Sequence, residues 1–299
     1  MASDGGSNVP INLMRGWPNK SLLPTDLIRS AAQKALADPA IAGEALEYGP
    51  DPGYEPLRRS LADWLASFYQ PDGSRTASSN LSITGGASQS LGAILSVYTD
   101  PSYTTNVWIV APAYMLAFSV FEDAGFAGRM RAIPEDDEGI DVEYLRTELR
   151  KSAENDRREG RTAEPKYKPR RSWAKVYRHV IYAVPTFANP SSRSMSLQRR
   201  EALVGTAREF DALIVADDVY DFLQWPAGVE LLSSPRLSTA HLPRLVDIDR
   251  SLNGGADRKD SDGFGNACSN GSFSKIAGPG IRVGWVEGTP KFAYGVSQW

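Results

Sequence analysis

GSFSKIAGPGIRVGW, residues 271–285, sets a lysine among hydroxyl side chains, then a glycine–proline turn, then an arginine on what reads as a short strand. The stretch contains no carboxylate, so its lysine and arginine do not neutralise an acid within it. Ser272, Ser274 and Arg282 are hydrogen-bond donors that suit an anion, and the guanidinium is a fixed, forked positive charge. The stretch therefore predicts an anion site.

Lys275 adds a second kind of chemistry to this site. A lysine amine that is desolvated, or placed near another cation, becomes nucleophilic and condenses with a carbonyl group to form a Schiff base. Pyridoxal 5'-phosphate carries both an aldehyde and a phosphate, and it would use every polar group of the stretch. The alternative is a surface loop in which Lys275 and Arg282 are merely solvated.

The order of residues from Ser272 to Trp285 resembles the lysine motif of the fold-type I, class I/II aminotransferases, S-F-S-K-x-x-x-P-G-x-R-x-G-W. The resemblance implies that Lys275 holds pyridoxal 5'-phosphate covalently and that Ser272, Ser274 and Arg282 hold its phosphate. It also implies an α/β fold with three layers, α/β/α, around a mainly parallel sheet.

Composition limits the other possibilities. The chain has 299 residues, which is enough for one large α/β domain or two ordinary ones. Its formal net charge of −3 gives no electrostatic footprint for nucleic acid or an anionic membrane. One cysteine and two histidines are too few for an internal disulfide or a typical zinc site. We expect a cytoplasmic protein without a metal, a nucleic-acid partner or a membrane span.

A second anion site is predicted near residue 86. Leu81–Thr84 reads as a strand, residues 85–89 as a turn of small residues, and Ser90–Val97 as a helix. Backbone N–H groups and the helix dipole point at such a turn. The resemblance assigns this turn to the cofactor phosphate, through Gly86, Ala87 and Ser88.

The same turn admits a rival interpretation. Thr84-Gly85-Gly86-Ala87-Ser88 looks like the nucleotide turn of short-chain dehydrogenases. That family also needs a Tyr-x-x-x-Lys pair, and no lysine in this sequence has a tyrosine four residues before it. The rival therefore lacks its catalytic pair.

Polar or aromatic residues follow three further apolar runs, at 107–110, 180–184 and 212–216. The alternation of such runs with helical patterns predicts βαβ units, in which ligands gather beyond the carboxyl ends of the strands. The resemblance implies that Tyr114 stacks on the pyridine ring and that Asn189 and Tyr220 bond its phenolic oxygen. It implies that Asp217 keeps the ring nitrogen protonated. Locally, Tyr114 could equally be a core residue and Asp217 a helix cap.

The amino-terminal part is predicted to be a separate segment. We expect residues 1–40 to form an arm and small-domain segment, and residues 41–299 the cofactor-binding large domain. A helix is expected over Thr25–Ala37, and its apolar face, predicted to be buried, consists of Leu27, Ile28, Ala31, Ala35 and Leu36. A second helix should bury Leu57, Leu61, Trp64, Leu65 and Phe68.

Two further motifs extend the resemblance toward this end of the chain. Residues 48–58 match Y-G-x-x-x-G-x-x-x-L-R, which implies a homodimer whose Tyr48 reaches the phosphate in the neighbouring site. Residues 12–18, N-L-x-x-G-x-P, look like the family's arm over the substrate pocket.

The implied function is transfer of an amino group between an α-amino acid and a 2-oxo acid. Lys275, Asp217 and Tyr220 are the candidate catalytic residues. Trp17 and Tyr114 favour bulky or aromatic substrates. Elimination, decarboxylation or condensation on the same scaffold is an alternative, because the cofactor supplies the chemistry. So is a cofactor-binding form without turnover, since the sequence stops at Trp299 and the family's carboxy-terminal small domain is expected to be largely missing.

Overall fold

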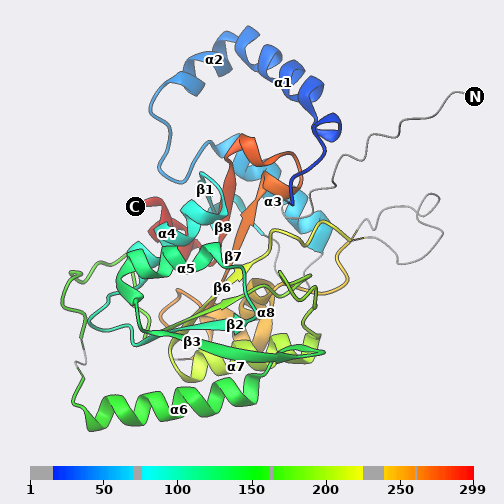
Figure 1. Cartoon of the computed structure of the whole chain (residues 1–299). Helices are drawn as coiled ribbons and strands as arrows, with labels where there is room; N and C mark the ends of the chain where they lie inside the picture. The colour runs from blue at the N-terminus through cyan, green and yellow to red at the C-terminus, as the bar shows by residue number, and fades with distance from the viewer. Residues whose placement is uncertain (1–15, 70–75, 162–163, 225–238, 260) are drawn as a thin grey trace, which may run out of the picture.

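The computed structural model describes residues 16–69, 76–161, 164–224, 239–259 and 261–299. Within these ranges the strands form one eight-stranded sheet, in the order β1-β8-β7-β6-β5-β2-β3-β4 (Figure 1). Strands β2, β3, β5, β6 and β7 pair in parallel, whereas β4 and β8 run antiparallel to their neighbours. The strands are β1 (Leu81–Thr84), β2 (Asn106–Ala111), β3 (Met130–Asp136), β4 (Gly139–Ile140), β5 (His179–Ala183), β6 (Ala212–Asp217), β7 (Ala267–Ser272) and β8 (Gly284–Glu287).

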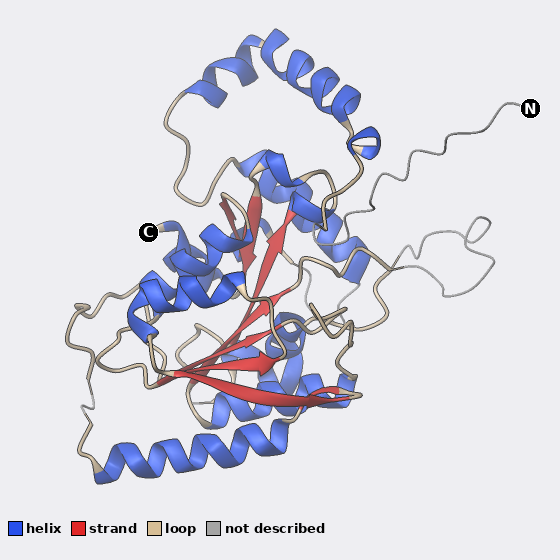
Figure 2. Ribbon diagram, in the orientation of Figure 1, coloured by secondary structure: helices blue, strands red, loops and turns tan. Residues whose placement is uncertain are grey.

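Helices cover both faces of this sheet, which gives the three predicted layers (Figure 2). One face packs against α4 (Ala87–Tyr98), α5 (Leu116–Phe121) and α9 (Pro290–Ser297). The other face packs against α6 (Val142–Arg158), α7 (Leu197–Glu209) and α8 (Leu245–Ser251). Because both faces are covered, the central strands are apolar at nearly every position; every residue of β5 is buried.

The helix α3 (Glu55–Tyr69) lies beside β1 and confirms the predicted core stripe in part, since Leu57 is half-buried. Its buried side chains include Leu61, Leu65 and Phe68, which pack with Leu81 and Trp285. Trp64 is half-buried and stacks on Phe222, with the ring centroids 4.1 Å apart.

The helices α1 (Thr25–Ala37) and α2 (Pro39–Leu46) pack on each other and stand away from the sheet (Figure 1). The predicted helix is present, but the prediction that its apolar face is buried is wrong: α1 has no buried residue, and Leu27 is 73% and Leu36 62% exposed. The cause is that α1 packs mainly against α2, so its apolar stripe has no core to enter within the described part of the chain.

The parallel strands bring the chemistry to one edge of the sheet. The chain turns into α4 after β1, and α4 contacts β7; β6 and β5 come next in the sheet, run parallel to β7 and end at the same edge. Residues that follow these strands in sequence are therefore neighbours in space. No helix within the described residues is long and apolar enough to cross a bilayer.

Candidate active site

A cavity of about 1040 Å³ lies at this edge of the sheet. Ten of the twelve residues predicted from the sequence line it: Ala87, Ser88, Tyr114, Asn189, Asp217, Tyr220, Ser272, Ser274, Lys275 and Arg282. They come from segments that are far apart in the sequence, so the fold alone brings them together. The predicted phosphate turn, the predicted ring contacts and the lysine share one space.

Gly86 forms one side of an anion cradle at the start of α4. Its backbone has φ 109° and ψ 168°, a conformation that is essentially restricted to glycine. A Cβ atom at this position would lie 2.5 Å from Nη2 of Arg282, so the guanidinium occupies the space that a side chain would fill. Gly86 is therefore part of the cradle although it does not line the cavity itself.

Serine hydroxyls and the Arg282 guanidinium complete the cradle. The Ser272 hydroxyl donates to Ser274 Oγ at 2.9 Å, and Arg282 Nη1 donates to the same oxygen at 3.3 Å. Arg282 Nη2 donates to the Gly85 carbonyl at 3.2 Å. Together with the N-terminus of α4, these groups could hold a phosphate.

Arg282 does not lie on a strand, contrary to the sequence-based expectation. It has left-handed backbone angles, φ 55° and ψ 42°, and β8 begins two residues later at Gly284. A tight turn over Pro279–Ile281 precedes it, and the left-handed residue reverses the chain so that the side chain points back to Gly85. A non-glycine residue in this region carries backbone strain on the order of 1–3 kcal/mol.

Lys275 ends a short turn, Phe273–Lys275, directly after β7. Its Nζ atom lies 5.6 Å from the ring centroid of Tyr220, which follows β6. Asn189 Nδ2 donates to the Tyr220 hydroxyl at 3.4 Å, so these two side chains form one polar pair beside the lysine. This pair is the one that the resemblance assigns to a phenolic oxygen.

Asp217 is the last residue of β6; the residue is half-buried, and its Oδ1 atom is removed from solvent. The Tyr182 hydroxyl donates to Oδ2 at 2.6 Å, whereas the buried Oδ1 atom has no hydrogen-bond partner among the described residues. Burial raises the pKa of Asp217 to about 6; nearby Asp221 acts in the same direction, and the Tyr182 hydrogen bond and Lys275 oppose it. A buried acceptor without a donor needs an explanation.

Pyridoxal 5'-phosphate fits this set of groups. Its protonated ring nitrogen would give Asp217 Oδ1 the missing donor, and its phosphate would use the cradle of Gly86, Ser274 and Arg282. Its phenolic oxygen suits the Asn189–Tyr220 pair, and its aldehyde suits Lys275. Asp217, Lys275, the Asn189–Tyr220 pair and the cradle thus each have a counterpart on the cofactor.

Two predicted features lie partly or wholly elsewhere. Tyr48 is fully exposed and does not line the cavity of its own chain, so its predicted role in a neighbouring site stays a prediction. Of the arm predicted over residues 12–18, positions 12–15 lie outside the described residues, while Gly16, Trp17 and Pro18 line the cavity.

Several lining residues were not identified from the sequence, among them Lys20, Tyr182 and Asn270. Asn270 is paired with Asp217 across β6 and β7, and its Nδ2 donates to the Ala87 carbonyl at 3.0 Å. Its buried Oδ1 has no partner within the described ranges. The register between two parallel strands is what places Asn270 here, and no local sequence pattern reports that register.

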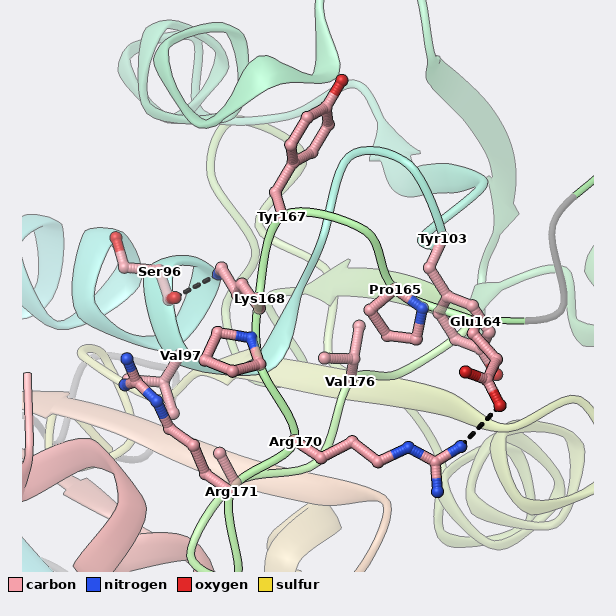
Figure 3. Close-up of a pocket in the computed structure, with 12 residues that line it drawn as sticks. Ser96, Val97, Tyr103, Glu164, Pro165, Tyr167, Lys168, Arg170, Arg171 and Val176 are labelled. Carbon is pink, nitrogen blue, oxygen red and sulfur yellow. Dashed lines mark hydrogen bonds and ion pairs between the residues drawn. The ribbon is translucent and has the colours of Figure 1, made fainter.

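A second cavity, of about 430 Å³, lies at the opposite end of α4 (Figure 3). Its basic side chains already have partners: Lys168 donates to the Ser96 carbonyl, Arg170 pairs with Glu164 at 2.7 Å, and the Arg171 guanidinium lies over the Trp173 ring. None of the predicted site residues lines it. The described residues also contain no cluster of three or more histidine, cysteine or acidic side chains arranged for a metal ion.

Comparison with known proteins identifies the family. The profile of the family "Aminotransferase class I and II" matches residues 18–298. An uncharacterized protein of Saccharomyces cerevisiae is 37% identical over 93% of this chain and 63% of its own length. Aromatic-amino-acid aminotransferase 1 of Thermococcus litoralis is 27% identical over 94% of this chain and 55% of its own.

A solved structure shares the fold. LysN, an α-aminoadipate aminotransferase of Thermus thermophilus complexed with N-(5'-phosphopyridoxyl)-L-leucine, superposes with a TM-score of 0.66 at 26% identity. The match covers 95% of this chain and 57% of the other. The chain thus spans between about half and two thirds of the length of these relatives.

Proposed function

Because the chain belongs to the class I and II aminotransferases, we propose that it transfers an amino group between an α-amino acid and a 2-oxo acid, using pyridoxal 5'-phosphate. The observation that carries the proposal is that Lys275 and Asp217 line one cavity and that Asp217 keeps a buried oxygen without a partner. This chemistry requires an amine at one side of a small ring and an acid at the opposite side.

The chain's own residues divide the work. When bound, the cofactor withdraws electrons from the substrate's α-carbon. Asp217 sustains this by holding a proton on the ring nitrogen, and Asn189 and Tyr220 steady the phenolic oxygen. Lys275 Nζ would act as the general base: it would take the proton from the substrate's α-carbon and then donate it to complete the transfer of the amino group.

The substrate side of the cavity favours bulky or aromatic amino acids. Trp17, Leu23, Tyr114 and Leu116 give it aromatic and aliphatic walls. The relative from Thermococcus litoralis bears the name of an aromatic-amino-acid aminotransferase, which supports the same substrate class. Elimination, decarboxylation and condensation are the alternative reactions, and each would give a different product in the assay described below.

We further propose that two chains form a homodimer in which Tyr48 completes the neighbouring phosphate site. Tyr48 is fully exposed, and the apolar side chains of α1 and α2 are uncovered, which supports a second chain at this surface. The division into an arm at 1–40 and a large domain at 41–299, and the cytoplasmic location, stay predictions with it.

The decisive experiment replaces Lys275 with alanine. The purified chain is mixed with pyridoxal 5'-phosphate, its visible absorbance is recorded, and aromatic amino acids are offered with 2-oxoglutarate. We expect Lys275→Ala to remove both the absorbance of the lysine-bound cofactor and the turnover. Lys151→Ala, at an exposed lysine on α6, should keep both.

Each other result has a defined meaning. A Lys275→Ala protein with undiminished absorbance and turnover refutes the assignment of the lysine. A native chain that binds the cofactor but forms no new amino acid refutes transamination, and products analysis then identifies elimination, decarboxylation, condensation or binding without turnover.

A further inference from the structure

Tyr182 is a buried tyrosine on β5 whose hydroxyl reaches the neighbouring strand. It is 1% exposed, and its ring packs edge-on against Phe121 of α5, with the centroids 5.6 Å apart. Tyr182 is paired with Val215 on β6, so its side chain and that of Asp217 lie on the same face of the sheet. The ring therefore holds the hydroxyl at a fixed place beside the carboxylate.

The hydrogen bond between the two side chains decides which oxygen of Asp217 is free. Tyr182 donates to Oδ2 at 2.6 Å, and a carboxylate is rigid and planar, so fixing one oxygen fixes the other. The other oxygen, Oδ1, is the buried atom without a partner, and the residue lines the cavity.

We propose that Tyr182 is the positioning residue of Asp217, holding its carboxylate ionised and turned so that Oδ1 meets the ring nitrogen of the bound cofactor. The inference rests on the cofactor part of the proposed function and goes beyond it, because it assigns a role to a residue on a different strand. Tyr182 acts through Asp217 and not on the reacting atoms.

The charges around Asp217 show why such a donor is needed. Burial and Asp221, four residues further along the chain, favour the neutral carboxyl group. Lys275, after β7, favours the charged form, but its amine is committed to the cofactor's aldehyde; Tyr220 faces the same carboxylate and is itself a weak acid. The Tyr182 hydroxyl supports the charge and takes no part in the reaction.

The experiment uses the full chain loaded with pyridoxal 5'-phosphate labelled at its ring nitrogen. In Tyr182→Phe, Asp217 loses its hydrogen bond, so the proton on the ring nitrogen moves to Oδ1; the total number of protons is unchanged. We expect the NMR signal of the ring nitrogen to move toward that of unprotonated pyridine at neutral pH. Affinity for the cofactor should fall about tenfold, as for loss of a hydrogen bond to a charged group.

Tyr177→Phe is the matched control. Tyr177 is also a buried tyrosine, and its hydroxyl donates to the Gly265 carbonyl at 2.5 Å, outside the cavity. This variant should lose stability but keep the ring-nitrogen signal. In an Asp217→Asn background, Tyr182→Phe should cause no further loss of affinity, since its effect passes through the carboxylate.

Two results would overturn the proposal: an unchanged ring-nitrogen signal in Tyr182→Phe, or an equal loss of affinity with and without Asp217. If Tyr182→Phe does not fold, 3-fluorotyrosine at this position keeps the ring and strengthens the donor. It should raise cofactor affinity, and an unchanged or lower affinity counts against the role. These readouts need binding but not turnover, so failure of transamination and failure of this proposal are distinguishable.

Discussion

Two acids in the same sheet, the buried Glu287 on β8 and the half-buried Asp217 on β6, have opposite surroundings. Glu287 accepts hydrogen bonds on both oxygens, from Thr76, Arg244 and Arg250. Burial opposes its ionisation, but the two guanidinium groups outweigh burial and lower the pKa of Glu287 to about 2. Every acceptor is used within the protein.

Asp217 has one hydrogen bond, one free buried oxygen and a pKa raised to about 6 by burial. No described residue donates a hydrogen bond to its Oδ1 atom. The difference teaches what to look for in a binding acid: an acceptor without a partner that also lines a cavity. Asp218 and Asp221 each have a buried oxygen without a partner among the described residues, but they do not line the cavity, so the free acceptor alone does not mark a binding site.

The largest effect on stability is expected at the saturated acid. Glu287→Gln leaves Arg244, 1% exposed, as a buried charge without full compensation. Removing one partner of a buried pair costs about 3–5 kcal/mol, which urea unfolding would measure. Glu148→Gln, at a helix-surface pair with Lys151, should cost less than about 0.5 kcal/mol. A loss at Glu287 as small as at Glu148 would remove the contrast.

At the binding acid, Asp217→Asn should act on catalysis and spare stability. It removes the charge that we propose to face the cofactor's ring nitrogen, so we expect turnover to fall by roughly 10²–10³-fold, as for loss of a preorganised electrostatic contact. The free energy of unfolding of the cofactor-free protein should stay the same or rise, because a desolvated carboxylate is removed. Steady-state kinetics and urea unfolding test both parts; a large loss of stability would make Asp217 a structural acid.

The two acids also predict opposite pH dependences of stability. The pKa of Asp217 is raised above its ordinary value near 4, so the folded protein binds this proton more tightly than the unfolded chain does. The resulting contribution to the free energy of unfolding is lost as pH rises from about 4 to 6. The pKa of Glu287 is lowered, so its contribution to the free energy of unfolding is lost as pH falls from about 4.5 to 2.

Each shift of about two pKa units corresponds to at most about 3 kcal/mol. The free energy of unfolding of the cofactor-free protein is measured across pH for the native chain, Asp217→Asn and Glu287→Gln. Subtracting each variant from the native chain gives the contribution of each acid. Slopes of the same sign for the two differences would contradict the comparison.

The smallest effect is expected at the phosphate cradle. Gly86→Ala places a Cβ atom at 2.5 Å from Arg282 in a backbone conformation reserved for glycine, which should cost about 1–3 kcal/mol and weaken cofactor binding. Gly92→Ala in the same helix meets nothing within 4 Å and should stabilise α4 by about 0.5–1 kcal/mol. Calorimetry on both variants provides the test, and equal effects would show that the cradle is not tightly built.

Sequence patterns predicted the parts of this molecule that are local. The strand before Asp217 and the glycine turn before α4 are visible as runs of residues, and the ordered motifs predicted one shared cavity. The pairing of Tyr182 with Asp217, and of Asn270 with Asp217, depends on which strands are neighbours and in what register, which local patterns do not report. The exposed face of α1 was missed for a related reason: an amphipathic pattern gives the apolar side but not what covers it.

The place of β8 in the sheet has a consequence for folding. Among the described strands, β1 pairs with β8 alone, and Leu81 lies opposite Glu287, about 200 residues later in the chain. At a synthesis rate of roughly 5–20 residues per second, β1 waits on the order of 10–40 s on the ribosome before its partner exists. The turn that follows β1 is the predicted phosphate turn, so we expect cofactor binding to become possible only after β8 has paired with β1.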